Sequence, residues 1–523
     1  MHPIAGLIVL IVAAGALPQA GTGVSSVADA AAPTSTGPAL VAEGMELLKA
    51  DRVSDAAARF AEAVRADPSL PAAHYFLGFT HERQRDWAAA QRAYERTLGL
   101  APGMAEAHDR LGFVLGHQGR TDDALAHFRQ AITLQPDLFD AHYHLGVTEW
   151  LARRYDAALH ALESAVRLRP QHAESHYYLG LVLRGRGDLT GAIEHLRQAA
   201  ALGPRLAVAH AHLGVTLREA GDLDSAVVAL REAIAIDPAS AEAANTLGLA
   251  LMERGDADDA IATFAGLVRA RPDYLPAQHN LGTAYMQKGD LKSAVEVFRG
   301  ITARDPANGE AFYNLGTALK QQDDFEGAEL ALREAVRLRP DLPEAHYVLG
   351  VVLWQTRRAA DAAAAFRAAL ERRPAYADAH YMLGTVLRQM GRPEEALARF
   401  QETLTHDPQS AEAWISIGQL RQRQRDADGA AAAFAEADRI RNKKADAQAA
   451  LFAIKTGMQQ LQAGDIAAAV VQLQEAVRLA PDNAQAHYQL ALALAKSGAQ
   501  EDARRHMADA RRLAPGMVPA DAK

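Results

Sequence analysis

Eight histidines could do chemistry, because imidazole is a common metal ligand and they recur at a regular spacing: His74, His108, His142, His176, His210, His346, His380 and His487. Successive members of the first five stand 34 residues apart, one in each copy of a repeated unit. Neighbouring helices pack at about 8–10 Å, which is too far for two such side chains to share one ion. The spacing therefore predicts packing residues and no metal site. His172 and His176 have a helical i, i+4 spacing, but His172 precedes the expected helix and no third ligand is evident.

No other pattern points to catalysis. The sequence contains no GxxxxGK[ST] phosphate loop, no GxSxG elbow and no HExxH zinc motif. Arg-Gly-Asp occurs at 186–188 and 254–256, and both copies fall where the repeat itself requires a Gly-Asp turn. We therefore predict no catalytic residues, no cofactor and no small-molecule substrate.

The element that must position all of these residues is a repeat of 34 residues. Prolines stand at this spacing without interruption from Pro68 to Pro408, and the series resumes five residues late at Pro481 and ends at Pro515. With the proline as position 32, repeat 1 spans 37–70, repeat 12 spans 411–444, and repeats 13 and 14 span 450–483 and 484–517. A unit this short cannot bury a core alone, so it must stack on its neighbours.

Each repeat predicts two helices, A and B. Apolar residues at positions 7, 8 and 11, and again at 20, 21, 24, 27 and 28, follow the helical period. A Gly-Asp pair at 15 and 16 ends helix A in the left-handed conformation, and the proline ends helix B. Position 8 is Gly in thirteen repeats and position 20 is Ala in all fourteen, which predicts a close helix crossing. Structural residues of this kind include Gly214, Ala226, Pro238, Gly248, Ala260 and Pro272.

This pattern resembles the tetratricopeptide repeat. The Ala-His-Tyr-x-Leu-Gly runs at 141–146, 175–180, 345–350 and 379–384 match its motif, with His in place of the usual Trp at position 4. The resemblance covers residues 37–517. It implies an all-α fold, a right-handed superhelical solenoid of about 14 helix pairs with helix A lining a concave groove.

The resemblance also implies that positions 5, 6 and 12 face the groove and bind peptides. Tyrosine suits a binding surface, since it offers a flat apolar body and a hydroxyl at low entropic cost. The candidate groove residues are Tyr75, Tyr143, Tyr177, Tyr313, Tyr347 and Tyr381 at position 5, Asn280 and Asn314 at position 6, and Arg184, Arg218, Lys320 and Arg388 at position 12. Trp150 and Trp354 also occupy position 12. The alternative is that the tyrosines only cover helix A.

Composition excludes several classes of protein. The 523 residues carry a net charge of −9 of mixed sign, with no basic run interleaved with aromatics, which argues against a nucleic-acid partner. The absence of cysteine excludes disulfides and thiolate zinc sites. Residues 4–17 form an apolar run of signal-peptide length. We expect residues 1–20 to be a signal peptide or an N-terminal membrane anchor, 21–36 a flexible linker, and the mature protein to be periplasmic or extracellular.

The late proline predicts a break after the array at 37–444. Residues 441–450 are interpreted either as a hinge or as an extended start to helix A of repeat 13, and the good helix formers from Ala445 to Ala453 favour the helix. Repeats 13 and 14 at 445–517 would then form a separate block before a tail at 518–523.

Taken together, these features predict a non-catalytic scaffold that presents its groove to peptide segments of partner proteins. One alternative is the substrate-recruiting arm of an O-linked N-acetylglucosamine transferase, which long arrays of this kind resemble. Only six residues follow repeat 14, so no catalytic domain follows in this sequence. Another alternative is an organiser of envelope assembly.

Overall fold

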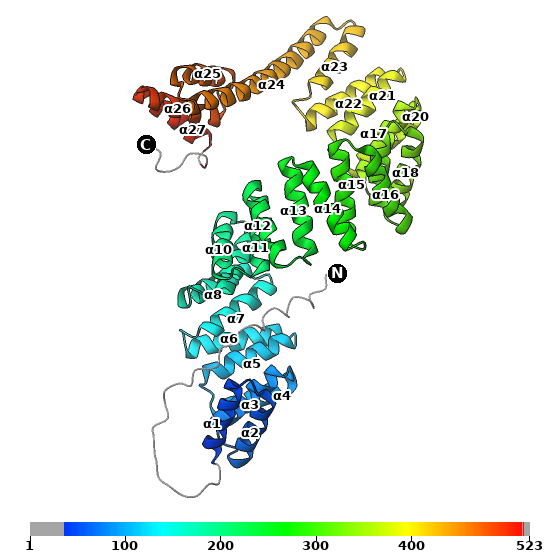
Figure 1. Ribbon diagram of the computed structural model, residues 1–523. Coiled ribbons are helices and arrows are strands. Elements are labelled where there is room, and N and C mark those ends of the chain that lie inside the picture. The colour runs from blue at the N-terminus through cyan, green and yellow to red at the C-terminus, as the bar shows by residue number, and fades with distance from the viewer. Residues whose placement is uncertain (1–35, 515, 517–523) are drawn as a thin grey trace. The chain divides into compact units, whose positions relative to one another are not determined.

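The computed structural model describes residues 36–514 and residue 516, and within them every regular element is a helix (Figure 1). The leader and most of the linker lie outside the described residues, as does the tail. The chain divides into two compact parts, Met1–Lys288 and Gly289–Lys523. No described helix is both long enough and apolar enough to cross a membrane.

The described helices of the N-terminal part are α1 (Gly37–Lys49), α2 (Val53–Ala66), α3 (Pro71–Arg83), α4 (Trp87–Leu100), α5 (Ala105–His117), α6 (Thr121–Leu134), α7 (Phe139–Leu151), α8 (Tyr155–Leu168), α9 (Ala173–Gly185), α10 (Leu189–Leu202), α11 (Ala207–Glu219), α12 (Leu223–Ile236), α13 (Ala241–Arg254), α14 (Ala257–Ala270) and α15 (Leu275–Lys288). Those of the C-terminal part are α16 (Leu291–Arg304), α17 (Gly309–Gln321), α18 (Phe325–Leu338), α19 (Pro343–Gln355), α20 (Ala359–Arg372), α21 (Ala377–Gln389), α22 (Pro393–His406), α23 (Ala411–Arg423), α24 (Ala427–Gln462), α25 (Ile466–Leu479), α26 (Ala484–Ser497) and α27 (Gln500–Leu513).

The predicted all-α solenoid is confirmed. Within each part, helices A and B of a repeat pack together as a hairpin, and every helix B also packs on helix A of the next repeat. The 27 described helices supply helices A and B of all fourteen repeats, because α24 serves both repeat 12 and repeat 13. The right-handed sense of the superhelix stays a prediction.

The turn between helices A and B also forms as predicted. Position 15 has positive φ in all fourteen repeats, and glycine occupies it in eight, including Gly187 at 84° and Gly255 at 97°. Aspartate at position 16 then caps helix B. For example, Asp188 accepts a hydrogen bond from the Gly191 amide at 2.9 Å. Both Arg-Gly-Asp runs place their glycine at this turn, although Asp256 makes no capping hydrogen bond with its side chain.

The glycine at position 8 makes room for a different partner from the one expected. A Cβ added at Gly214 would lie 2.4 Å from Leu230 Cγ, whereas the nearest atom of Ala226 is its carbonyl oxygen at 3.2 Å. Position 8 therefore accommodates the large side chain at position 24, and the fully buried alanine at position 20 supplies backbone to the same crossing. The prediction of a close crossing is right, but its main contact is with position 24.

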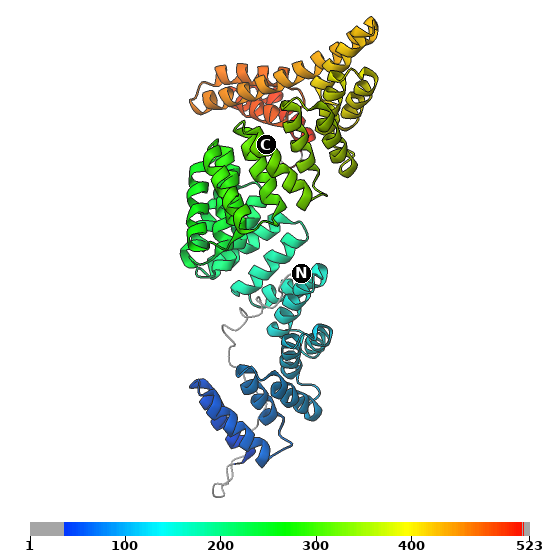
Figure 2. The same cartoon turned by 90° about the vertical axis from the view of Figure 1, so that its right-hand side faces the viewer.

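The five-residue insertion is absorbed by a helix rather than by a hinge. Figures 1 and 2 show α24 as one continuous helix, and it contains 36 residues. Its N-terminal half packs on α23 and its C-terminal half on α25. Between these halves, the side chains of residues 441–449 are all exposed, so the middle of the helix buries little surface against its neighbours.

We expect trypsin to cut first at Arg441, Lys443 or Lys444. A helical segment that lacks tertiary packing is marginally stable and opens locally at low cost. Limited digestion of the full chain, followed by mass spectrometry of the fragments, will locate the first cut. An earlier cut at a turn between repeats within 71–410 would show that the exposed stretch of α24 is not the weakest segment.

Candidate functional site

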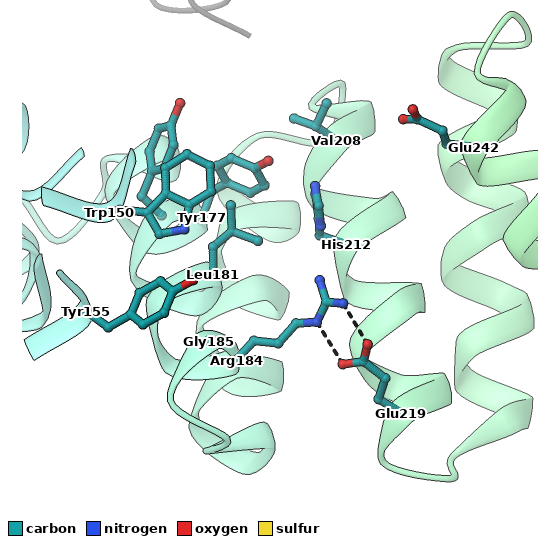
Figure 3. A pocket seen from close by; sticks show the side chains of 11 residues that line it. Trp150, Tyr155, Tyr177, Leu181, Arg184, Gly185, Val208, His212, Glu219 and Glu242 are labelled. Carbon is teal, nitrogen blue, oxygen red and sulfur yellow. Dashed lines mark hydrogen bonds and ion pairs between the residues drawn. The ribbon is translucent and has the colours of Figure 1, made fainter. Parts of the chain in front are cut away.

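One cavity of the N-terminal part lies among α7, α8, α9, α11 and α13 (Figure 3). Its volume is about 640 Å³. The residues that line it are Trp150, Tyr155, Tyr177, Tyr178, Leu181, Arg184, Gly185, Val208, His212, Glu219 and Glu242. Ten of the eleven stand at positions 2, 5, 6, 9, 12 and 13 of helix A in repeats 4 to 7. This spacing of three to four residues puts them on one face of each helix.

One wall of the cavity is aromatic. The ring of Tyr178 meets Trp150 edge-on at 5.2 Å and Tyr177 edge-on at 5.0 Å. The Tyr155 ring of α8 packs against Gly185 of α9. A Cβ added at Gly185 would lie 2.9 Å from that ring. Gly185 is therefore needed for this wall to pack.

Arg184 and Glu219 form a bidentate ion pair at the bottom of the cavity. The guanidinium donates from Nε and Nη2 to the two carboxylate oxygens, at 2.7 and 2.6 Å (Figure 3). The hydrogen bonds from Arg184 hold the pKa of Glu219 below its usual value. Because both partners are engaged with each other, the cavity offers little net charge at this end.

His212 and Glu242 supply the remaining polar groups. Burial, followed by the nearby Arg184 guanidinium, lowers the pKa of His212 to about 4, so its ring is neutral at pH 7. Its Nδ1 is buried and has no hydrogen-bond partner among the described residues. Glu242 stands exposed at the opposite rim from Trp150 and Tyr177 (Figure 3). A second cavity of about 120 Å³ shares Val208, His212 and Glu242 and extends the hollow along α11 and α13.

The tyrosines at position 5 turn out to be packing residues. Tyr75, Tyr143 and Tyr177 are only 2%, 8% and 9% exposed, while Tyr313, Tyr347 and Tyr381 are half-buried. In several repeats the ring lies against the aromatic side chain at position 24, as Tyr347 does with Phe366 at 5.7 Å and Tyr381 with Phe400 at 5.6 Å. Position 5 therefore contributes to packing, and the binding role of these tyrosines stays a prediction. Of these six tyrosines, Tyr177 lines the cavity.

The predicted residues at positions 6 and 12 are half-buried and mostly engaged with the neighbouring repeat. Arg218 pairs with Glu253 at 2.5 Å and Arg388 donates to Gln419 at 2.9 Å. Asn280 donates to Asn245 at 2.9 Å. Asn314 and Lys320 are half-buried in the C-terminal part. Their role in binding stays a prediction; of the candidates, Tyr177 and Arg184 line the cavity described above, together with Trp150 at position 12.

The histidines at position 4 have the packing role that the spacing predicted. In seven of the eight repeats Nε2 bonds to the carbonyl oxygen of the proline that ends the preceding helix B, as in His74 to Pro68 at 3.0 Å. The ring therefore ties helix A to the preceding repeat. His210 is the exception, since its Nε2 has no partner among the described residues.

A buried charge network in repeats 2 to 4 was not anticipated. Glu82 accepts a hydrogen bond from the Tyr94 hydroxyl at 2.7 Å and pairs with Arg110 at 3.3 Å. A carboxylate oxygen of Asp109 lies 2.8 Å from His144 Nδ1, and the Asp109 side chain is only 3% exposed. The available signal was Asp109-Arg110 at positions 5 and 6, where seven other repeats place tyrosine at position 5 and most place a neutral residue at position 6.

Comparison with protein-family models identifies the repeat. Models described as tetratricopeptide repeat match residues 41–105, 143–207 and 103–171, and one described as TPR repeat matches 216–255 and 459–498. The C-terminal domain model of cilia and flagella-associated protein 70 matches residues 240–453. None of the curated proteins matches the sequence significantly.

Among solved structures, the chain is similar to MamA, with 28% identity over 32% of this chain and 96% of that one, at a TM-score of 0.31. It is also similar to YrrB, described as a TPR protein with an unusual peptide-binding site, with 22% identity over 36% and 97% of the two chains and a TM-score of 0.34. Yeast Tom70 shares 14% identity over 78% of this chain and 96% of its own, at a TM-score of 0.36.

Proposed function

Because this chain is a tetratricopeptide-repeat protein, we propose that it is a non-catalytic scaffold that binds peptide segments of partner proteins in the cavity of repeats 4 to 7. The observation that carries the proposal is a cavity of about 640 Å³ with an aromatic wall, built from the helix-A faces of consecutive repeats. Sites for ligands are typically concave and mostly apolar, with a few convergent polar groups.

The lining defines the peptide that fits. Trp150, Tyr177 and Leu181 form an apolar surface that accommodates a leucine or aromatic side chain. Arg184 is already neutralised by Glu219, so it does not select an acidic peptide. Glu242 at the rim is exposed and favours a basic group. The preferred segment therefore carries an apolar anchor followed closely by Lys or Arg.

Selection from a random peptide library displayed on phage, with the full chain as bait, tests this proposal. We expect enriched peptides to combine a leucine or aromatic residue with a neighbouring Lys or Arg. Val208→Glu puts a carboxylate into the apolar part of the cavity and should weaken a selected peptide by about tenfold or more, equivalent to about 1.4 kcal/mol.

Val228→Glu is the matched control. Val228 stands in the same repeat, on α12, with 62% of its surface exposed, so the same substitution there should leave affinity unchanged. Equal affinity of the two variants would place the peptide elsewhere, and a library that yields no binder would contradict the scaffold.

Export remains part of the proposal. The apolar run within residues 1–20 and the linker at 21–36 support it. The alternative of a transferase arm rests on the sequence resemblance alone, and an envelope organiser remains the other alternative.

A further inference from the structure

The histidine at position 4 is held in a form that suits metal binding in two repeats of the C-terminal part. His380 Nε2 bonds to the Pro374 carbonyl at 2.8 Å and His487 Nε2 to the Pro481 carbonyl at 3.0 Å. Since a carbonyl only accepts, Nε2 carries the proton and the lone pair of the neutral ring is on Nδ1. A metal-binding histidine is commonly oriented by this kind of hydrogen bond from its other nitrogen. Both rings are more than nine-tenths buried, at 5% and 6% exposure.

In repeat 14, two side chains of helix B that can bind a metal lie close to Nδ1 of the position-4 histidine. Nδ1 of His506 lies 3.0 Å from Nδ1 of His487, and the nearer carboxylate oxygen of Asp509 lies 3.8 Å from the same atom. His506 and Asp509 stand one helical turn apart on α27. One ligand atom from each of the three residues lies within 4.8 Å of the other two.

Repeat 11 has the same three groups in another order. His380, Glu402 and His406 also place their ligand atoms within 4.8 Å of one another. Glu402 Oε2 and His406 Nε2 are 4.0 Å apart on the last turn of α22. Nδ1 of His380 is buried and has no hydrogen-bond partner among the described residues, so this lone pair is unused by the protein.

We propose that repeats 11 and 14 each bind a divalent transition metal ion of the zinc class, through the position-4 histidine of helix A and a histidine and a carboxylate of helix B. Imidazole and carboxylate suit zinc, which binds them at about 2.0–2.2 Å, so two ligands of a tetrahedral ion lie about 3.3 Å apart. The observed separations reach this value when the helix-B side chains, exposed in repeat 11 and partly exposed in repeat 14, move by about an ångström. Water completes the coordination.

The chain contains natural comparisons for this arrangement. Repeats 3 and 5 have the same histidine pairs, His108 with His127 at 2.9 Å and His176 with His195 at 3.1 Å. Position 26, however, is glutamine there, whereas it is Glu402 in repeat 11 and Asp509 in repeat 14. Repeat 6 has Glu232 at position 26 but no second histidine on helix B. Within the described part of the chain, only repeats 11 and 14 form a group of three.

A metal at these positions would join helix A to helix B within one repeat. In repeat 14 the ion would tie α26 to α27, the last pair of the described solenoid. Because the ion binds the folded repeat and not its separated helices, it would raise the stability of these pairs. Repeats 11 and 14 would then unfold less readily in the presence of zinc.

Zinc titration of the full chain, prepared without a histidine tag, tests the proposal by calorimetry and by native mass spectrometry. We expect two equivalents per chain. Asp509→Asn with His506→Ala should remove one equivalent, and Glu402→Gln with His406→Ala the other, with zinc affinity at each altered site falling at least about tenfold. These side chains are on the surface of helix B, and unchanged circular dichroism will show that folding is intact.

Two further variants distinguish zinc bound by the three-residue groups from zinc bound non-specifically elsewhere on the protein. His195→Ala removes a histidine pair without a carboxylate and should leave both equivalents in place. Gln198→Asp supplies the missing carboxylate in repeat 5 and should add a third equivalent. Zinc binding that none of the ligand substitutions reduces, or no zinc bound at all, would overturn the proposal.

Discussion

Replacing Glu82 with alanine will lower the stability of repeats 2 and 3 by about 3–5 kcal/mol, the cost expected when one partner of a buried ion pair is removed. Glu82 is the acceptor for the fully buried Tyr94 hydroxyl and the closer of the two carboxylates that face Arg110. Without it, Arg110 keeps only Asp109, at 3.9 Å, and the Tyr94 hydroxyl loses its acceptor. Hydrogen exchange of α3 to α5 in the full chain will measure the local opening free energy.

Glu46→Ala is the control for an exposed ion pair. Glu46 meets Lys49 at 2.6 Å on α1, but its side chain is 71% exposed, so the pair should contribute no more than about 0.5 kcal/mol. Glu82→Gln should fall between the two, because the amide oxygen can still accept from Tyr94. A loss below about 1 kcal/mol for Glu82→Ala would mean that water replaces the carboxylate.

Adding a single methyl group at Gly248 will destabilise repeat 7 by about 1–3 kcal/mol, the usual cost of overpacking a core. The new Cβ would lie 2.4 Å from two atoms of the Phe264 ring, which is itself fully buried and cannot withdraw. The same clash should recur wherever position 8 faces a ring at position 24, as at Gly350 with Phe366. Thermal unfolding of Gly248→Ala followed by circular dichroism will measure the change.

Gly266→Ala is a matched control in the same repeat. Gly266 lies inside α14, and an added Cβ there meets nothing within 4 Å. Alanine is favoured over glycine in a helix by about 1 kcal/mol, so this variant should be more stable than the parent chain. If both alanine variants raise stability, helix propensity and not the contact with Phe264 governs position 8.

Much of the candidate peptide site could not be predicted from position numbers alone. Position 12 was expected to face the groove, and Arg184 does line the cavity, but its charge is taken up by Glu219, 35 residues further along the chain. That offset joins position 12 of one repeat to position 13 of the next. Only the packing of α9 against α11 shows that these two side chains meet. Tyr177 lines the cavity while its counterparts Tyr75 and Tyr143 are buried elsewhere.

The sequence by itself determined the elements and their boundaries. Pro68 and its successors end helix B because a residue before proline disfavours helical geometry, and Gly187 and its equivalents allow the left-handed turn. These are local effects of the backbone, so a regular spacing of residue types is enough to reveal them. The sequence left a hinge and a helix open for residues 441–450, with good helix formers favouring the helix, and the structure shows one continuous helix from Ala427 to Gln462.

The tertiary structure alone decided which side chains meet. Gly214 faces Leu230 more closely than Ala226, and His487 meets His506 and Asp509, because a helix-A residue contacts whichever part of helix B the crossing angle brings against it. The same histidine at position 4 is a packing residue in repeat 2, where Arg96 stands at position 26, and a candidate metal ligand in repeat 14. The difference lies in residues more than 18 positions away, whose distance in space no local pattern encodes.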